Sequence, residues 1–125
     1  SDVARTFRGV ARTLNAGGLF QFDMNTQHWL RWLGGREKLF HVGPNYFMAY
    51  NGYLPKEKLA TFNQLWFLRD GDRYRKRLVT VHERAYPTAE IRRMLAAAGF
   101  DVLKVEVQRE FEGKPIRMLY LARRR

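Results

Sequence analysis

Three residues with useful chemistry alternate along one predicted strand over 73–86, namely His82, Arg84 and Tyr86. Successive side chains of a strand point to opposite faces, so this spacing places an imidazole, a guanidinium and a phenol on one side. Such a row could move a proton through the imidazole and hold an anionic group with the guanidinium. A solvated strand face with mixed polar residues would look the same, so the residues alone leave both interpretations open.

A second group of polar residues follows an apolar run nearer the amino end. The segment Leu19–Asp23 reads LFQFD, and we predict a strand buried on both faces, as in parallel sheets covered by helices. Ligands of open sheets of that class bind outside the carboxyl ends of the strands, where Asp23 and Asn25 stand. The alternative is that both residues only cap the segment that follows.

Several other chemistries find little support in the sequence. The chain has no cysteine, which excludes disulfides and thiolate metal sites. His28, His41 and His82 lack the spacing of a two-histidine helix site, so we predict no metal. The pair Gly17-Gly18 follows a predicted helix instead of opening one, which argues against a phosphate-binding loop. No serine has the sequence context of a strand-to-helix nucleophile turn.

The basic charge points to a different class of function, a small nucleic-acid-binding module without catalysis. The formal net charge is +11 over 125 residues, and cations and aromatic rings are interleaved around a predicted hairpin. Rings can stack on bases while cations hold phosphate. The alternative is a hairpin whose aromatic rings form its core and whose basic residues cover its solvent-exposed face. The residues concerned are Arg69, Arg73, Arg75, Lys76 and Arg77, with Trp66, Phe67 and Tyr74.

Apolar spacing and turn residues predict the elements that must position these groups. Helical spacing predicts a first helix that Ser1 or Asp2 caps, and Asp70-Gly71-Asp72 predicts a hairpin turn between two long strands. Pro87 and Thr88 open a later helix. In order, we predict helices over 3–14 and 26–33, two or three long antiparallel strands within 39–86, a helix over 88–98, and a hairpin pairing 100–111 with 116–122.

Length and composition fit one folded domain. The 125 residues are 46% hydrophobic, which is enough for a sizeable core. No apolar run is long enough to span a membrane and no signal-peptide pattern is present, so we expect a cytoplasmic protein without a membrane partner.

Two stretches of the sequence resemble one known family. The segment 7–25, FRGVARTLNAGGLFQFDMN, resembles the helix, Gly-Gly turn and fifth strand of class I S-adenosylmethionine-dependent methyltransferases, although Asn15-Ala16 stands where Lys-Pro is common. The segment 66–103, WFLRDGDRYRKRLVTVHERAYPTAEIRRMLAAAGFDVL, is similar to the insert strands, helix and sixth strand of a bacterial subgroup. The row His82-x-Arg84-x-Tyr86, followed by a helix and Ala98-Gly99-Phe100, is its most specific part.

The resemblance implies an α/β fold, the carboxyl half of a doubly wound, Rossmann-like methyltransferase sheet with an inserted antiparallel β lid. The core half would comprise 1–25 and 87–125, and the inserted helix and lid 26–86. The last strand should lie antiparallel between the other two core strands. The family's first strands and glycine-rich cofactor loop have no counterpart in this sequence, so the missing amino-terminal half of the same protein is an expected partner.

The resemblance also implies roles for individual residues. The full-length parent would use S-adenosylmethionine and act on a small-molecule or nucleic-acid methyl acceptor. This half would supply the substrate wall, with Asp23, Asn25, Arg84 and Tyr86 binding the acceptor and His82 as the catalytic base or hydrogen-bond partner. The residues that bind the cofactor stay unassigned, and we expect the chain alone to be inactive.

Overall fold

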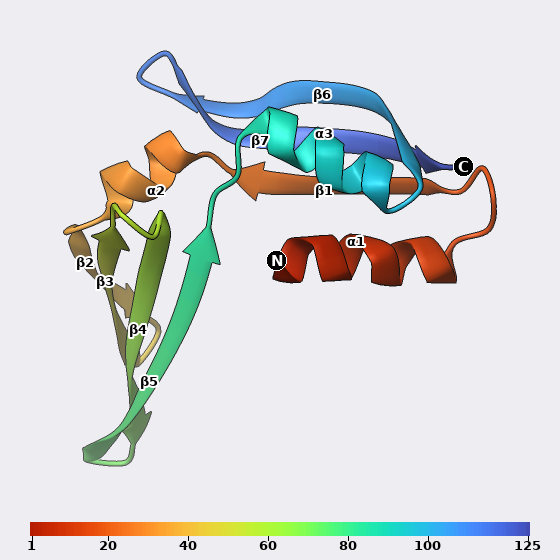
Figure 1. Cartoon of the computed structure of the whole chain (residues 1–125). Helices are drawn as coiled ribbons and strands as arrows, with labels where there is room; N and C mark the ends of the chain where they lie inside the picture. The colour runs from red at the N-terminus through yellow and green to blue at the C-terminus, as the bar shows by residue number, and fades with distance from the viewer. The chain divides into compact units, whose positions relative to one another are not determined.

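The computed structural model describes all 125 residues and divides into two compact units (Figure 1). The first unit comprises residues 1–29 and 86–125, and the second comprises residues 30–85. The short helix α2, Gln27–Leu33, carries the chain from the first unit into the second. Each unit has its own sheet and its own buried cluster. The division into a core half and an inserted lid remains a prediction.

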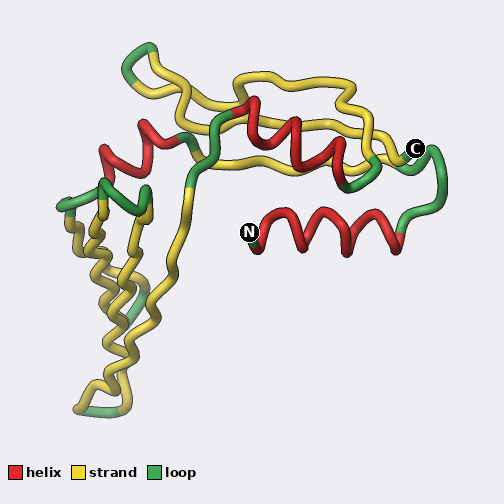
Figure 2. Tube along the Cα trace, viewed as in Figure 1, coloured by secondary structure: helices red, strands yellow, loops and turns green.

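The first unit is a three-stranded antiparallel sheet with two helices (Figures 1 and 2). The strand order is β1-β7-β6, so the last strand pairs antiparallel with both of the others. This order confirms the predicted place of the last strand. The elements are α1 Asp2–Thr13, β1 Leu19–Asn25, α3 Thr88–Ala97, β6 Phe100–Phe111 and β7 Lys114–Arg124.

Both helices of this unit pack on one face of the sheet. Phe7 of α1 and Leu95 of α3 share a buried cluster with Tyr120 of the central strand. Phe22 of β1 stacks on Tyr120 with ring centroids 5.0 Å apart and an interplanar angle of 9°. Apolar burial of this kind contributes about 1.5–3 kcal/mol for each large side chain, so the cluster is the main source of stability in the unit.

The prediction that Leu19–Asp23 is buried on both faces is wrong. Burial alternates along β1, and Leu19 remains 57% exposed. The strand is also at an edge of the sheet, because its only neighbour is β7. The physical reason is that α1 and α3 both cover the Phe22 face, and no element of this chain covers the opposite face.

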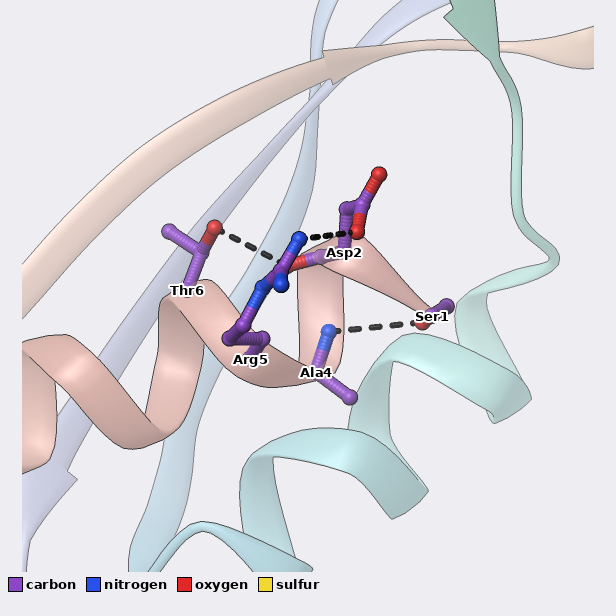
Figure 3. A network of polar contacts seen from close by, with 5 residues as sticks. All are labelled: Ser1, Asp2, Ala4, Arg5 and Thr6. Carbon is purple, nitrogen blue, oxygen red and sulfur yellow. Dashed lines mark hydrogen bonds and ion pairs between the residues drawn. The ribbon is translucent and has the colours of Figure 1, made fainter.

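Local chemistry explains where the elements begin and turn. The Ser1 hydroxyl caps α1 by accepting from the Ala4 N–H at 3.3 Å, and Thr6 Oγ1 donates to the Asp2 carbonyl at 3.0 Å (Figure 3). Between β6 and β7, Glu112 and Gly113 have φ values of 50° and 73°. Two consecutive left-handed residues form the hairpin turn whose twist matches that of the flanking strands.

The second unit is a four-stranded antiparallel sheet in the order β2-β3-β4-β5 (Figure 1). Its three long strands agree with the prediction of two or three within 39–86, and a fourth, shorter strand begins at Glu37. Leu30 of α2 is buried against Ala60 and Ala85, with Tyr53 and Phe62 packed around them. The strands are β2 Glu37–Val42, β3 Asn45–Leu54, β4 Leu59–Asp70 and β5 Arg73–Arg84.

The helices of the chain are short. None of them combines the length and the apolar character that crossing a membrane requires.

Replacing Leu95 tests whether α3 is packed on the sheet. Leu95 is fully buried, so Leu95→Ala should lower the free energy of unfolding by about 2–5 kcal/mol through lost burial and a residual cavity. The matched control is Leu103→Ala on β6, where the side chain is 45% exposed and the expected loss is below about 1 kcal/mol. Urea unfolding followed by circular dichroism measures both, and equal losses would contradict the packing of α3.

Candidate functional site

A cavity of about 320 Å³ lies within the first unit, where β1 ends and α3 begins. Its volume falls at the lower end of the range for small-molecule sites, about 300–1,000 Å³. Two thioethers give it apolar surface, and amides, hydroxyls and an imidazole give it polar groups. The lining residues are Met24, Asn25, Thr26, Gln27, His28, Tyr86, Pro87, Thr88, Met118 and Tyr120.

Thr26 holds the end of β1 in place beside the cavity. Its N–H donates to the carbonyl of Ile116 at 3.0 Å, and its hydroxyl donates to the carbonyl of Pro115 at 2.8 Å. The same oxygen accepts from the N–H of Trp29 at 3.2 Å, which caps the first turn of α2. Asn25 and His28 therefore flank a residue that is fixed to β7 by two hydrogen bonds.

The opposite wall joins α3 to the central strand. The hydroxyls of Thr88 and Tyr120 lie 3.2 Å apart, and Tyr120 is only 1% exposed. Pro87 and Thr88 were predicted to open this helix. Thr88 is the first residue of α3, and Pro87 occupies the cap position without a side-chain hydrogen bond. The cavity thus sits between a rigid strand and the amino end of a helix.

The structure brings together two of the five predicted site residues. Asn25 and Tyr86 both line the cavity, although they are 61 positions apart in the chain. Asp23 does not line it. Its carboxylate lies 3.7 Å from a guanidinium nitrogen of Arg117 on the neighbouring strand, with both side chains well exposed. A surface ion pair of this kind contributes little to stability.

The prediction that Tyr86 shares a strand face with His82 and Arg84 is wrong. Strand β5 ends at Arg84, so the alternation of side chains does not continue to Tyr86. Tyr86 is partly buried against the cluster of the first unit, whereas the other two residues belong to the second unit. The following Pro87 has a fixed φ and no N–H, which is typical of a position where a strand stops.

His82 and Arg84 lie on an exposed strand in the second unit. His82 Nδ1 is 3.3 Å from the hydroxyl of Thr61, its direct partner on β4. Arg84 Nε donates to the carbonyl of Glu57 at 3.1 Å. The roles of both residues toward a substrate stay predictions.

Sequence analysis missed several residues of the cavity. His28 was considered only as a metal ligand, and Thr88 only as a helix residue. The signal that could have identified His28 is the polar run 25–28 directly after the strand, since ligands of open sheets bind at such ends. Tyr120 gave no such signal, because its role depends on the register between β7 and β1.

The basic hairpin does not gather its rings and cations on one surface. The register places Trp66 opposite Arg77, and Phe67 opposite Lys76, on alternate faces of the sheet. Arg75 lies 3.7 Å from a carboxylate oxygen of Asp70. No group of three metal-ligating side chains occurs anywhere in the chain.

Comparisons with known proteins identify the fold. No family model and no curated protein matches the chain. A solved S-adenosylmethionine-dependent methyltransferase from Clostridium acetobutylicum ATCC 824 is 24% identical, with a TM-score of 0.82. The sugar N-methyltransferase KedS8 from Streptoalloteichus sp ATCC 53650 is 20% identical, with a TM-score of 0.70. SAM-bound CalS10, an amino pentose methyltransferase from Micromonospora echinaspora, is 16% identical, with a TM-score of 0.66.

The matches cover nearly all of this chain but only about half of each solved protein. The covered shares are 98% of this chain and 51%, 48% and 50% of the three methyltransferases, respectively. The chain therefore has the fold of about half of an S-adenosylmethionine-dependent methyltransferase, consistent with a carboxyl-terminal half.

The residues of this chain do not by themselves fit S-adenosylmethionine. A nucleoside cofactor needs a loop whose backbone approaches it closely, which usually takes a glycine turn between a strand and a helix. Here Gly17 and Gly18 connect α1 to β1, so the turn runs from helix to strand. This turn therefore does not supply such a loop.

Removing the Tyr120 hydroxyl tests the wall of the cavity. Tyr120→Phe keeps the stack on Phe22 but removes the partner of Thr88, and should lower the free energy of unfolding by about 0.5–1.5 kcal/mol. Tyr74→Phe is the control, because Tyr74 is 44% exposed on β5 and should change stability by less than about 0.5 kcal/mol. Urea unfolding compares the two. A Tyr120→Phe variant as stable as the control would contradict a hydrogen bond between these hydroxyls.

Proposed function

We propose that this chain is the carboxyl half of an S-adenosylmethionine-dependent methyltransferase and supplies the acceptor side of its active site. The observation that carries the proposal is the likeness of nearly the whole chain to half of such enzymes, with a TM-score of 0.82 for one of them. Fold alone does not define an activity, so the proposal also needs a site. The cavity at the end of β1 is that site.

The position of the cavity agrees with an acceptor site. It opens beside the carboxyl end of β1 and the amino end of α3, the region of an open α/β sheet where ligands bind. Asn25 offers a carboxamide, His28 an imidazole and Tyr86 a phenol, and Met24 and Met118 line the apolar part. This combination suits a polar organic molecule with an apolar body.

Methyl transfer requires little covalent chemistry from these residues. The cofactor, when bound, supplies a methyl group that is already activated on sulfur. The side chains of this chain would bind and orient the acceptor and exclude water around it. A base is required only if the acceptor nucleophile carries a proton that must leave, and His28 of the cavity or His82 of the lid could accept it.

We also assign to the acceptor two residues of the inserted segment 26–86. By the resemblance, His82 would be a base or hydrogen-bond partner and Arg84 would hold an anionic group. Arg84 uses only its Nε in the bond to Glu57, which leaves the other guanidinium N–H groups for an anionic or carbonyl group of the acceptor. Asp23 would contact the acceptor outside the cavity, because its carboxylate lies beside Arg117.

An amino sugar is the first acceptor to test. KedS8 is a sugar N-methyltransferase and CalS10 an amino pentose methyltransferase. Amide, phenol and imidazole groups are suitable partners for sugar hydroxyls and for an amine. The net charge of +11 keeps a nucleic-acid module as the alternative, and its affinity for RNA should fall steeply with salt because phosphate contacts release counterions.

In the complete enzyme, Arg84→Ala should weaken acceptor binding about tenfold and leave cofactor affinity nearly unchanged. The matched control is Arg73→Ala on the same strand, where the side chain is exposed and has no ion-pair partner. Steady-state kinetics with varied acceptor and calorimetry with S-adenosylhomocysteine separate the two effects. Loss of cofactor affinity with unchanged acceptor binding would contradict the assignment of Arg84 to the acceptor.

The isolated chain of 125 residues should bind S-adenosylmethionine weakly or not at all. The reason is that both glycine pairs of the chain, Gly17-Gly18 and Gly34-Gly35, follow a helix. Neither forms the turn from a strand into a helix that lets the backbone approach a cofactor closely. Calorimetry of the chain with the cofactor is the measurement, with the complete enzyme as the positive control. Submicromolar binding by the chain alone would show that the half-enzyme proposal is wrong.

A further inference from the structure

The second unit contains a cavity of about 540 Å³ that shares no lining residue with the cavity at the end of β1. It lies between the end of α2 and one face of strands β2 and β3. Its volume is in the middle of the range for small-molecule sites, about 300–1,000 Å³. All of its lining residues fall within 32–51, so one compact unit forms it completely.

Phe40 and Ala49 of the sheet give this cavity an apolar floor. Phe47 and Trp66 support Phe40 from outside the lining. Phe40 stacks on Phe47 across the β2–β3 pair, with ring centroids 5.4 Å apart and an interplanar angle of 26°. Phe47 packs in turn on Trp66, at 4.5 Å and 30°. Next to the rings the register pairs Lys38 with Ala49, and the small side chain of Ala49 leaves room above the sheet. A planar ligand could pack on such a surface.

Arg36 is held in place at the mouth of the cavity. Its backbone N–H donates to the carbonyl of Leu33, and its carbonyl accepts from the N–H of Asn51. Its Nε donates to the carbonyl of Trp32 at 2.7 Å, and its guanidinium carbon lies 3.7 Å from the centroid of the Trp32 ring. These contacts use one N–H of the guanidinium and leave the others for a ligand, at little further cost in conformational entropy.

The other charges of the cavity favour an anion. Lys38 Nζ lies 4.9 Å from the centroid of the Phe40 ring, and the carboxamide of Asn51 also lines the site. Glu37 is the one acidic residue of the lining, and it forms no ion pair with Arg36 or Lys38. Two cations therefore face the ligand space against one carboxylate.

We infer that this cavity binds a planar aromatic anion, an aryl carboxylate or aryl phosphate. The ring of the ligand packs on Ala49 and beside the Phe40 ring. Its anionic group takes the free N–H groups of Arg36, with Lys38 close by, because a guanidinium pairs with two oxygens of a carboxylate or phosphate at once. None of these residues lines the cavity at the end of β1.

The test titrates the full 125-residue chain with 1-naphthoate and with phenyl phosphate, by calorimetry and by NMR of the tryptophan indole N–H signals. We expect saturable binding that shifts the signal of Trp32 and leaves that of Trp29, in the other unit, unchanged. Acetate and inorganic phosphate lack the ring and should bind at least about tenfold more weakly. Benzylamine, which carries the ring and the opposite charge, should not bind.

Two variants locate the binding within the cavity. Arg36→Gln should weaken 1-naphthoate about tenfold, and Ala49→Leu should abolish binding by filling the floor while it keeps every charge. Arg92→Gln, on the exposed face of α3, is the matched control and should bind as the parent chain does. Circular dichroism verifies that each variant is folded. Equal losses in Arg36→Gln and Arg92→Gln, or binding of benzylamine as tight as that of 1-naphthoate, would overturn the inference.

Discussion

The first unit depends on the burial of Tyr120 in the central strand. Its ring stacks on Phe22 of β1, its hydroxyl lies beside Thr88 of α3, and the helices cover it from one side. A phenol buried this deeply needs a hydrogen-bond partner, and Thr88 at the start of α3 provides one. The same contact joins α3 to the sheet, and both of its residues line the cavity.

The sheet order follows from the same constraint. Because β7 is the central strand, its residues pair with β1 on one side and β6 on the other, and the unit cannot close before its last strand is in place. The tight Glu112-Gly113 turn brings β7 back along β6, and the register then presents Tyr120 to Phe22. The cavity is therefore formed by segments from both ends of the sequence.

Local patterns predicted the elements but not their surroundings. The spacing of Phe7 and Ala11, the turn at Gly71, and the Pro87 start of α3 depend on chemistry within a few residues, and the structure agrees with each. Burial of Leu19 was predicted wrongly because an apolar run does not reveal which face a helix will cover.

The candidate site was predictable only in part, for a related reason. Asn25 was predicted because the end of a strand is a feature of local sequence. His28 and Thr88 line the same cavity only because the pairing of distant strands brings their segments together. Tyr86 lines the cavity, but not as a member of the strand row that led to it. Alternation along β5 predicted the common face of His82 and Arg84, because both residues lie within the regular strand.

The most direct test of the acceptor-side assignment determines which residues surround the reactive methyl group. Complete enzyme loaded with S-adenosylmethionine carrying a ¹³C-labelled methyl group can be examined for isotope-edited nuclear Overhauser contacts from that methyl. The account predicts contacts to side chains of the β1 cavity, among them Asn25, His28 and Tyr86, because a transferable methyl must point into the acceptor space. Contacts confined to residues outside 1–125 would contradict it.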